Sequence, residues 1–348
     1  MRDNRKNLKA LAFIFCFLWL GAAVGCSHRP LLVDQGGVVF CLPPVCPDLT
    51  LAVAADITVA ELAARYAPAF KIYEGTTSYN RIGRPALRRK ADCGDFEVFV
   101  DPEKPVIFYE QSDFVTDRGK YSNLIYRVHF EKVPFSMLPF YVTAGRHPGL
   151  LVIVTLNQSL EPVLLTLVHT CGCYLAIIPT TALAAEAFPE QWKSSAVLSV
   201  YGEELPALLD YAMVKKPQLL VSLRPDVHRI MDLEIVAALE RQSVGPAKMV
   251  PASLEPMARL DALVGGLEPV SFFHGQGLLQ DHVKGALKPW ETLLMSWFSL
   301  DLWVGMDKRL GSGSNLENPF YTSLKPWQRR ASDMNDFPRF LQYWGWRL

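Results

Sequence analysis

The chain has 348 residues, and its 35 basic residues (Lys plus Arg) balance its 35 acidic residues (Asp plus Glu) at pH 7. Half of the residues are hydrophobic, and the charge is neither extreme nor gathered in low-complexity segments. This composition excludes a strongly basic nucleic-acid-binding protein and predicts a folded chain that buries a sizeable core.

The amino-terminal 25 residues have the organisation of a signal peptide. Four basic residues precede the apolar run LAFIFCFLWLGAAVG (residues 11–25), which is too short and wrongly flanked for a membrane-spanning helix. The succession of Ala23, Val24, Gly25 and Cys26 resembles the lipobox of bacterial lipoproteins. In that family the cysteine is diacylated and becomes the first residue of the mature chain. An ordinary signal peptide followed by a chance cysteine is the alternative.

The resemblance implies a protein of the bacterial cell envelope that carries lipid (palmitate) on Cys26 and has the membrane as its first partner. Ser27, which follows that cysteine, favours the outer membrane over the inner one by the habit of the family. Removal of the first 25 residues, four of them basic and one acidic, leaves 31 basic and 34 acidic residues. The mature chain is then slightly acidic, which argues further against a nucleic-acid partner.

Residues 26–56 are expected to form a lipid anchor and tether. Four prolines surround Cys41 and Cys46 in this stretch, and such proline-rich sequence is typical of a loop. The first helix is expected directly after it, in TVAELAARY. Thr58 and Glu61 stand at capping-box spacing there, and apolar residues recur with the helical period.

Between residues 69 and 180 the sequence predicts strands. Six runs rich in β-branched and aromatic residues have strand length, namely FEVFV, PVIFYE, NLIYRVHFE, FYVTA, LLVIVTL and PVLLTLV. DPEKP and NQSLEP are expected to be hairpin connections, and the last two runs, apolar on both faces, to be central strands. A membrane-spanning helix from Pro162 is the alternative, but Pro179 follows too soon for the roughly 20 residues that a span needs.

The stretch LVHTCGCYLAII (residues 167–178) places His169, Cys171 and Cys173 two residues apart in an apolar run. An envelope location permits disulfides, for which Cys41 and Cys46 are the leading pair. The candidate disulfide cysteines are Cys41, Cys46, Cys93, Cys171 and Cys173.

Three interpretations of this stretch are open. On an extended strand the three side chains point to one face, where they could bind zinc together with Cys93. Alternatively, Cys171 and Cys173 bond to each other, since Gly172 lets the chain bend, and they form an easily reduced pair. In the third interpretation one of them pairs with Cys93 and the other is a buried free thiol.

Two further groups are candidates for binding. His129 and His147 would form a three-histidine metal site with His169 if their strands lie side by side. The chain has one basic cluster, formed by Arg81, Arg84, Arg88, Arg89 and Lys90. This cluster is expected to be either a solvated loop or a contact for anionic lipid head groups. The sequence lacks the best-marked hydrolase, metalloprotease and thioredoxin-like motifs, so it specifies no reaction.

After residue 185 the pattern predicts helices, in LPALLDYAMV, VHRIMDLEIVAALERQ and MARLDALVGGL. Two copies of LKPW are expected to start further helices, because proline suits the first helical turn. Segment 287–348 is rich in tryptophan and is expected to contact either the protein's own sheet or a membrane or partner. In its first helix Trp290, Leu294 and Trp297 would lie on one side, away from Glu291.

Together the patterns predict an α+β fold, with a mostly antiparallel sheet-rich half followed by a helical, aromatic-rich half. The expected organisation is a signal peptide (1–25), a tether (26–56), a sheet-rich domain (57–185) and a helical region (186–348), which could pack on the sheet as one domain. The first functional hypothesis is a noncatalytic binding or scaffolding component with an envelope protein partner. The second is an envelope enzyme or metal carrier that uses His169, Cys171 and Cys173.

Overall fold

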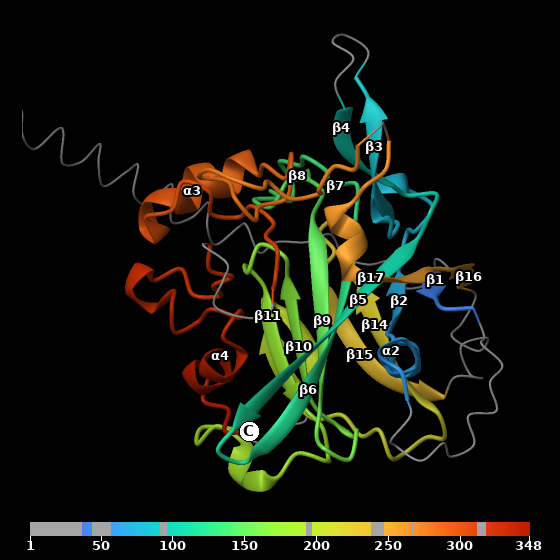
Figure 1. Cartoon of the computed structure of the whole chain (residues 1–348), viewed down its shortest axis with the longest axis vertical. Helices are drawn as coiled ribbons and strands as arrows, with labels where there is room; N and C mark the ends of the chain where they lie inside the picture. The colour runs from blue at the N-terminus through green and yellow to red at the C-terminus, as the bar shows by residue number, and fades with distance from the viewer. Residues whose placement is uncertain are drawn as a thin grey trace, which may run out of the picture.

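The computed structural model describes residues 37–43, 57–90, 96–192, 197–237, 247–265, 268–311 and 318–348 (Figure 1). The predicted signal peptide, the predicted lipidation site Cys26, most of the predicted tether, Cys46 and Cys93 lie outside the described residues. Strand accounts for 41% of the structure and helix for 15%, distributed over several sheets, so the fold is mixed α and β.

The larger sheet has six strands in the order β11-β10-β9-β6-β5-β17. Its strands are β5 (Val106–Thr116), β6 (Gly119–His129), β9 (Gly149–Leu156), β10 (Pro162–His169), β11 (Leu175–Pro179) and β17 (Ser253–Pro256). Neighbours are antiparallel except β17, which runs parallel to β5. Every residue of β9 and β10 is buried inside this sheet, and NQSLEP connects the two strands, so both sequence predictions are confirmed.

The second sheet has five strands in the order β15-β14-β2-β1-β16. They are β1 (Val38–Cys41), β2 (Ala69–Ile72), β14 (Pro217–Leu223), β15 (Ile230–Ala237) and β16 (Lys248–Pro251). This sheet is mixed, because β1 and β2 are antiparallel to each other whereas each also has a parallel neighbour. Strands from the first and last thirds of the chain therefore share one sheet.

Three two-stranded ribbons complete the β structure of the described residues. They pair β3 (Arg84–Arg89) with β4 (Phe96–Asp101), β7 (Lys132–Val133) with β8 (Gly145–Arg146), and β12 (Val197–Val200) with β13 (Glu203–Pro206). DPEKP is not a hairpin connection, since β4 pairs with β3 and not with β5. FYVTA is not a strand either, because Tyr141 and Ala144 close a hydrogen-bonded turn there.

Two hydrophobic cores lie on the two faces of the six-stranded sheet. Alternate residues of β9 point in opposite directions. Val152 belongs to the first core, between the sheets, with Phe70 and Val221 of the five-stranded sheet. Ile153 belongs to the second core, which C-terminal residues such as Phe340 cover. Strands β9 and β10 are apolar on both faces, as predicted, because a hydrophobic core packs against each face of the sheet.

Helix α2 (Val59–Tyr66) forms where the sequence predicts it. Thr58 Oγ1 accepts a hydrogen bond from the backbone N–H of Glu61, and the Glu61 carboxylate accepts one from the backbone N–H of Thr58. This is the predicted capping box. Leu62 and Tyr66 of the helix then pack into the core between the two sheets.

The prediction of a mainly helical second half is wrong. In the described part of that half the α-helices are α3 (Pro289–Ser299) and α4 (Phe337–Tyr343), and both are short. LPALLDYAMV begins at the end of β13 and continues as loop, and most of the described part of VHRIMDLEIVAALERQ is β15. The described part of MARLDALVGGL contains the short 3₁₀ helix Met257–Asp261. Periodicity predicts a helix for the segment that contains β15, but pairing with β14 makes it a strand.

Both copies of LKPW do start helical turns. The first begins α3, and the second begins the 3₁₀ helix Pro326–Gln328. The alternative helix from Pro162 is not formed, because that segment is the hairpin of β10 and β11. Over the described residues, no helix combines the length and the apolar character that crossing a bilayer requires.

Candidate functional site

The stretch around Cys171 is the hairpin loop between β10 and β11. Strand β10 ends at His169, and the backbone N–H of Gly172 then donates to the carbonyl of His169 at 2.7 Å. Gly172 has φ +79°, in the left-handed region that favours glycine. The first interpretation placed residues 169, 171 and 173 along one extended strand, and the chain does not have that geometry, because it turns after His169.

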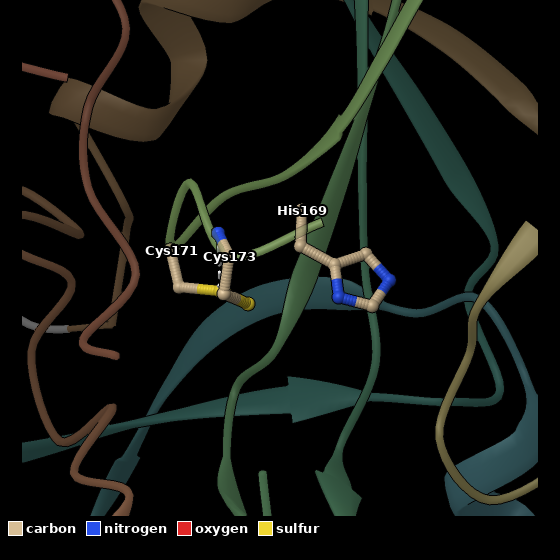
Figure 2. Close-up of side chains that lie close together, drawn as sticks. All are labelled: His169, Cys171 and Cys173. Atoms are coloured by element: carbon tan, nitrogen blue, oxygen red, sulfur yellow. Dashed lines mark hydrogen bonds between the residues drawn. A yellow bond between two sulfur atoms is a disulfide. The ribbon is translucent and has the colours of Figure 1, made fainter. Parts of the chain in front are cut away.

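Cys171 and Cys173 form a disulfide with each other (Figure 2). Their Cα atoms are 5.4 Å apart, which is within the usual range for a disulfide, because the turn brings them closer than a straight strand does. Cys171 is buried and Cys173 is half-buried. The structure thus agrees with the second interpretation of this stretch, a bond between Cys171 and Cys173. Neither cysteine pairs with Cys93. Cys41 is a buried free cysteine, and its predicted partner Cys46 lies outside the described residues.

His169 lies beside the disulfide, on the face of the sheet that meets the first core. Its ring stacks on Tyr174, with centroids 5.2 Å apart. Its Nε2 lies 3.1 Å from the backbone carbonyl of His228, and since a carbonyl can only accept, Nε2 carries the hydrogen. Burial, followed by the charge of Lys288, lowers the pKa of His169 to about 4, so the ring is neutral at neutral pH.

The neutral imidazole leaves its second nitrogen, Nδ1, with a lone pair. In Figure 2 Nδ1, the nitrogen next to the ring's attachment point, is on the side of the sulfur atoms. One ligand atom from each of His169, Cys171 and Cys173 lies within 4.8 Å of the others. This group could therefore hold a metal ion, provided that the disulfide is open.

The possible three-histidine site of His129, His147 and His169 is not formed. His129 pairs in register with Gly149, whereas His169 pairs with Leu150, so the two rings point to opposite faces of the sheet. His129 accepts a hydrogen bond at 2.8 Å from Arg127, which is fully buried. Burial and the Arg127 charge hold the pKa of His129 well below its usual value. The rings of His129 and His147 both lie near Phe272, a residue of the second core.

A buried ion pair ties the hairpin loop to the C-terminal layer, and sequence reasoning missed it. Asp307 is completely buried, and its carboxylate lies 3.0 Å from the Nζ of Lys288, the residue directly before α3. The same carboxylate accepts hydrogen bonds from the hydroxyl of Thr170 and, at 3.2 Å, from the backbone N–H of Gly149. In the sequence, nothing marks this ion pair, because Asp307 stands in no recognisable motif. The contact joins the disulfide loop to the start of α3.

Helix α3 presents its apolar side chains to solvent. The exposed fractions of Leu293 and Trp297 are 66% and 51%, whereas Glu291 and Ser299 are buried. Trp290 and Trp297 do share a side, as predicted. That side faces outward, and the buried residues of the helix are the polar Glu291 and Ser299.

The exposed apolar area extends beyond α3. The ring of Trp290 lies 6.0 Å from that of Phe135 and 5.7 Å from that of Phe140, and Leu138 in the same loop is 87% exposed. We call this area the α3 surface. It consists of Phe135, Met137, Leu138, Trp290, Leu293, Trp297, Phe298, Leu300 and Leu302.

The basic cluster is largely paired with carboxylates. Arg81 binds Glu103 at 2.7 Å, Arg88 binds Glu97 at 2.5 Å, and Arg84 makes a two-pronged ion pair with Glu255. Arg89 and Lys90 are exposed at the end of β3, beside each other. The ion pairs reduce the net positive charge that this cluster can offer to an anionic surface.

Comparison with known proteins gives no relative. No protein-family model, no curated protein and no solved structure matches the chain.

Proposed function

We propose that this protein is a lipid-anchored binding or scaffolding component of the bacterial envelope and that it binds an envelope protein through the α3 surface. The orientation of α3 carries this proposal. A helix on a soluble protein normally buries its apolar stripe and exposes its charges. In α3 the Glu291 carboxyl is buried and Trp297 is half exposed, so the helix presents the side chains that protein interfaces favour.

A protein partner suits this surface better than lipid does. Interfacial membrane helices usually carry exposed Lys or Arg that meet the phosphate head groups. Between residues 287 and 303 the only basic residue is Lys288, and it is buried. The core of a protein–protein interface is instead rich in aromatic and aliphatic side chains and poor in charged ones.

We expect Leu293→Asp combined with Trp297→Ala to lower partner recovery about tenfold or more after crosslinking in intact cells, because a buried tryptophan is a frequent interface hot spot. The control is Met213→Asp, whose side chain is 78% exposed and lies outside the α3 surface. Both variants should melt as the wild type does, since exposed substitutions usually change stability by less than about 0.5 kcal/mol.

Equal recovery of partners by both variants would contradict the proposed binding role. A second contradictory result would come from vesicle flotation of the chain without its first 26 residues. If that chain floats with vesicles and the α3 variant does not, the surface binds lipid and the proposed protein partner is wrong.

Lipid attachment at Cys26 is the second expected result, and it follows from the lipobox resemblance. Mass spectrometry of the native amino terminus should find an acylated cysteine, and Cys26→Ala should move the protein out of the membrane fraction. One acyl chain gives only marginal binding, whereas two or more anchor a protein stably. A Cys26→Ala protein that still fractionates entirely with membranes would count against the anchor.

The Cys171–Cys173 disulfide favours a second candidate function, a thiol-dependent or metal-binding activity in the envelope. Cys173 is half-buried, so a dithiol substrate or reductant can approach one sulfur of the pair. Zinc would suit the reduced form if Cys93 joins His169, Cys171 and Cys173 as fourth ligand.

Contact of the basic cluster with anionic head groups remains a separate proposal, for which the exposed Arg89 and Lys90 are the best candidates.

A further inference from the structure

We propose that reduction of the Cys171–Cys173 disulfide opens a site for a soft, thiolate-seeking copper(I) ion, with the two sulfurs and His169 Nδ1 as its three ligands. This inference deepens the second candidate function and rests on it. It does not depend on the α3 surface.

The donor atoms are already close to the positions that such an ion needs. One ligand atom of each residue lies within 4.8 Å of the others, and three ligands that surround one ion at bond lengths of about 2.0–2.3 Å are roughly 3.5–4 Å apart. Opening the S–S bond separates the sulfurs toward that distance. Side-chain rotation of the two cysteines can do this without movement of the strand that holds His169.

The backbone of the loop is held in place from both sides. Thr170 is fixed through its hydroxyl by Asp307 and through its carbonyl by the N–H of Lys308, at 2.8 Å. A Cβ on Gly172 would lie only 2.2 Å from the carbonyl oxygen of Tyr321, so the C-terminal segment lies directly against the turn. The loop should therefore keep its shape when the disulfide opens, and the ligands are preorganised.

The hydrogen bond from His169 sets the ligand nitrogen. Nε2 donates to the carbonyl of His228 and so cannot bind an ion, which leaves the lone pair on Nδ1. A histidine that ligates a metal commonly donates its other N–H to a carbonyl in this way, and the bond fixes both tautomer and ring orientation.

The donor set selects the ion. Thiolate sulfur is a soft ligand that favours copper(I) or zinc over harder cations. Structural zinc almost always takes four protein ligands, whereas copper(I) is satisfied by two or three, mostly sulfur. In the described part of the chain, the group of potential metal ligands at this loop has three members, His169, Cys171 and Cys173. Three donors with two sulfurs fit copper(I).

The chemistry of opening the site balances with an external thiol reductant. Two thiols, R–SH, supply two electrons and two protons to the disulfide and leave as R–S–S–R, so Cys171 and Cys173 become thiols. Copper(I) then displaces the two thiol protons as the Cu–S bonds form. The oxidised disulfide offers no thiolate and should not hold the ion.

The test is a copper(I) titration of the full chain under anaerobic conditions against a chromophoric copper(I) chelator. Protein reduced with a phosphine and then desalted should bind one ion per chain at this site, at least about 100-fold more tightly than the oxidised protein. His169→Gln should weaken binding by about 10-fold or more, and Cys41→Ala, which removes the buried free thiol, should leave it unchanged. X-ray absorption of the wild-type complex should show two sulfur ligands and one nitrogen ligand, which keeps the test valid if a variant misfolds.

The results that overturn the proposal are distinct from those that overturn the second candidate function. If alkylation shows that both thiols are freed but copper(I) binds equally to oxidised and reduced protein, the copper site is wrong and a thiol function survives. The copper site is also wrong if one zinc ion binds and copper(I) does not, or if Cys41→Ala abolishes binding. If the disulfide resists reduction in the folded protein, both the copper site and the thiol function fail.

Discussion

Replacement of Asp307 by alanine should lower the free energy of unfolding by about 3–5 kcal/mol, because removing one partner of a buried ion pair leaves the other charge uncompensated. The charge left behind is the ammonium of Lys288, which is 2% exposed. The substitution also removes the acceptor for Thr170 and for the N–H of Gly149. Denaturant unfolding of the purified chain measures the loss.

A double variant separates the cost of the lone charge from the value of the pair. Asp307→Asn combined with Lys288→Met removes both charges at nearly unchanged side-chain volume, and neutral replacements of a buried ion pair that keep its volume are often close to neutral. It should recover much of the stability that Asp307→Ala loses. A loss below about 0.5 kcal/mol for Asp307→Ala would show that the ion pair does not hold the C-terminal layer on the hairpin loop.

Phe340→Ala should cost about 3–5 kcal/mol, since truncating a large core side chain loses both its burial and its packing. Phe340 lies in α4, is completely buried, and packs in the second core together with Trp346 and Leu348. Trp327→Ala is the matched control, because Trp327 belongs to the same aromatic-rich segment but is 79% exposed.

Thermal or denaturant unfolding should show a large shift for Phe340→Ala and almost none for Trp327→Ala. Equal effects of the two variants would mean that the C-terminal segment does not form the second layer on the six-stranded sheet. The expected results would show that Phe340 belongs to the core part of the tryptophan-rich segment and Trp327 to its surface part.

Several elements could be predicted from the sequence because local and tertiary preferences agree in them. Thr58 and Glu61 form a capping box from residues three apart, which needs no tertiary information. Strands β9 and β10 are apolar at every position, and this pattern arises when both faces of a sheet are covered. Proline at the start of α3 likewise marks the helix start locally.

The second half was mispredicted because its segments depend on distant partners. Ile230–Ala237 reads as a helix by composition, yet it pairs along its length with β14. In α3 the apolar side chains do recur with the helical period, but this period does not show whether the apolar side faces the protein or the solvent. Which side of the helix meets the protein is set by Glu291, Ser299 and the surrounding loops, and the sequence alone carries no signal for that choice.

The residues of the candidate site could be identified from the sequence, but their arrangement could not. The spacing of His169, Cys171 and Cys173 singled out the stretch, and Gly172 indicated the possible bend. Whether the chain would bend there depends on the hydrogen bonds that close the hairpin and on Tyr321, which lies against the turn from more than a hundred residues away. Asp307, which holds the loop, had no recognisable motif.

The most direct test of the binding role is site-specific photocrosslinking in intact cells. A photoreactive amino acid at position 293, on the α3 surface, should give a discrete protein adduct, whereas the same probe at position 213, which is also exposed, should not. The adduct should disappear when Trp297 is also replaced by alanine. Adducts to lipid alone, or the same adducts from both positions, would contradict the proposal that the α3 surface binds an envelope protein.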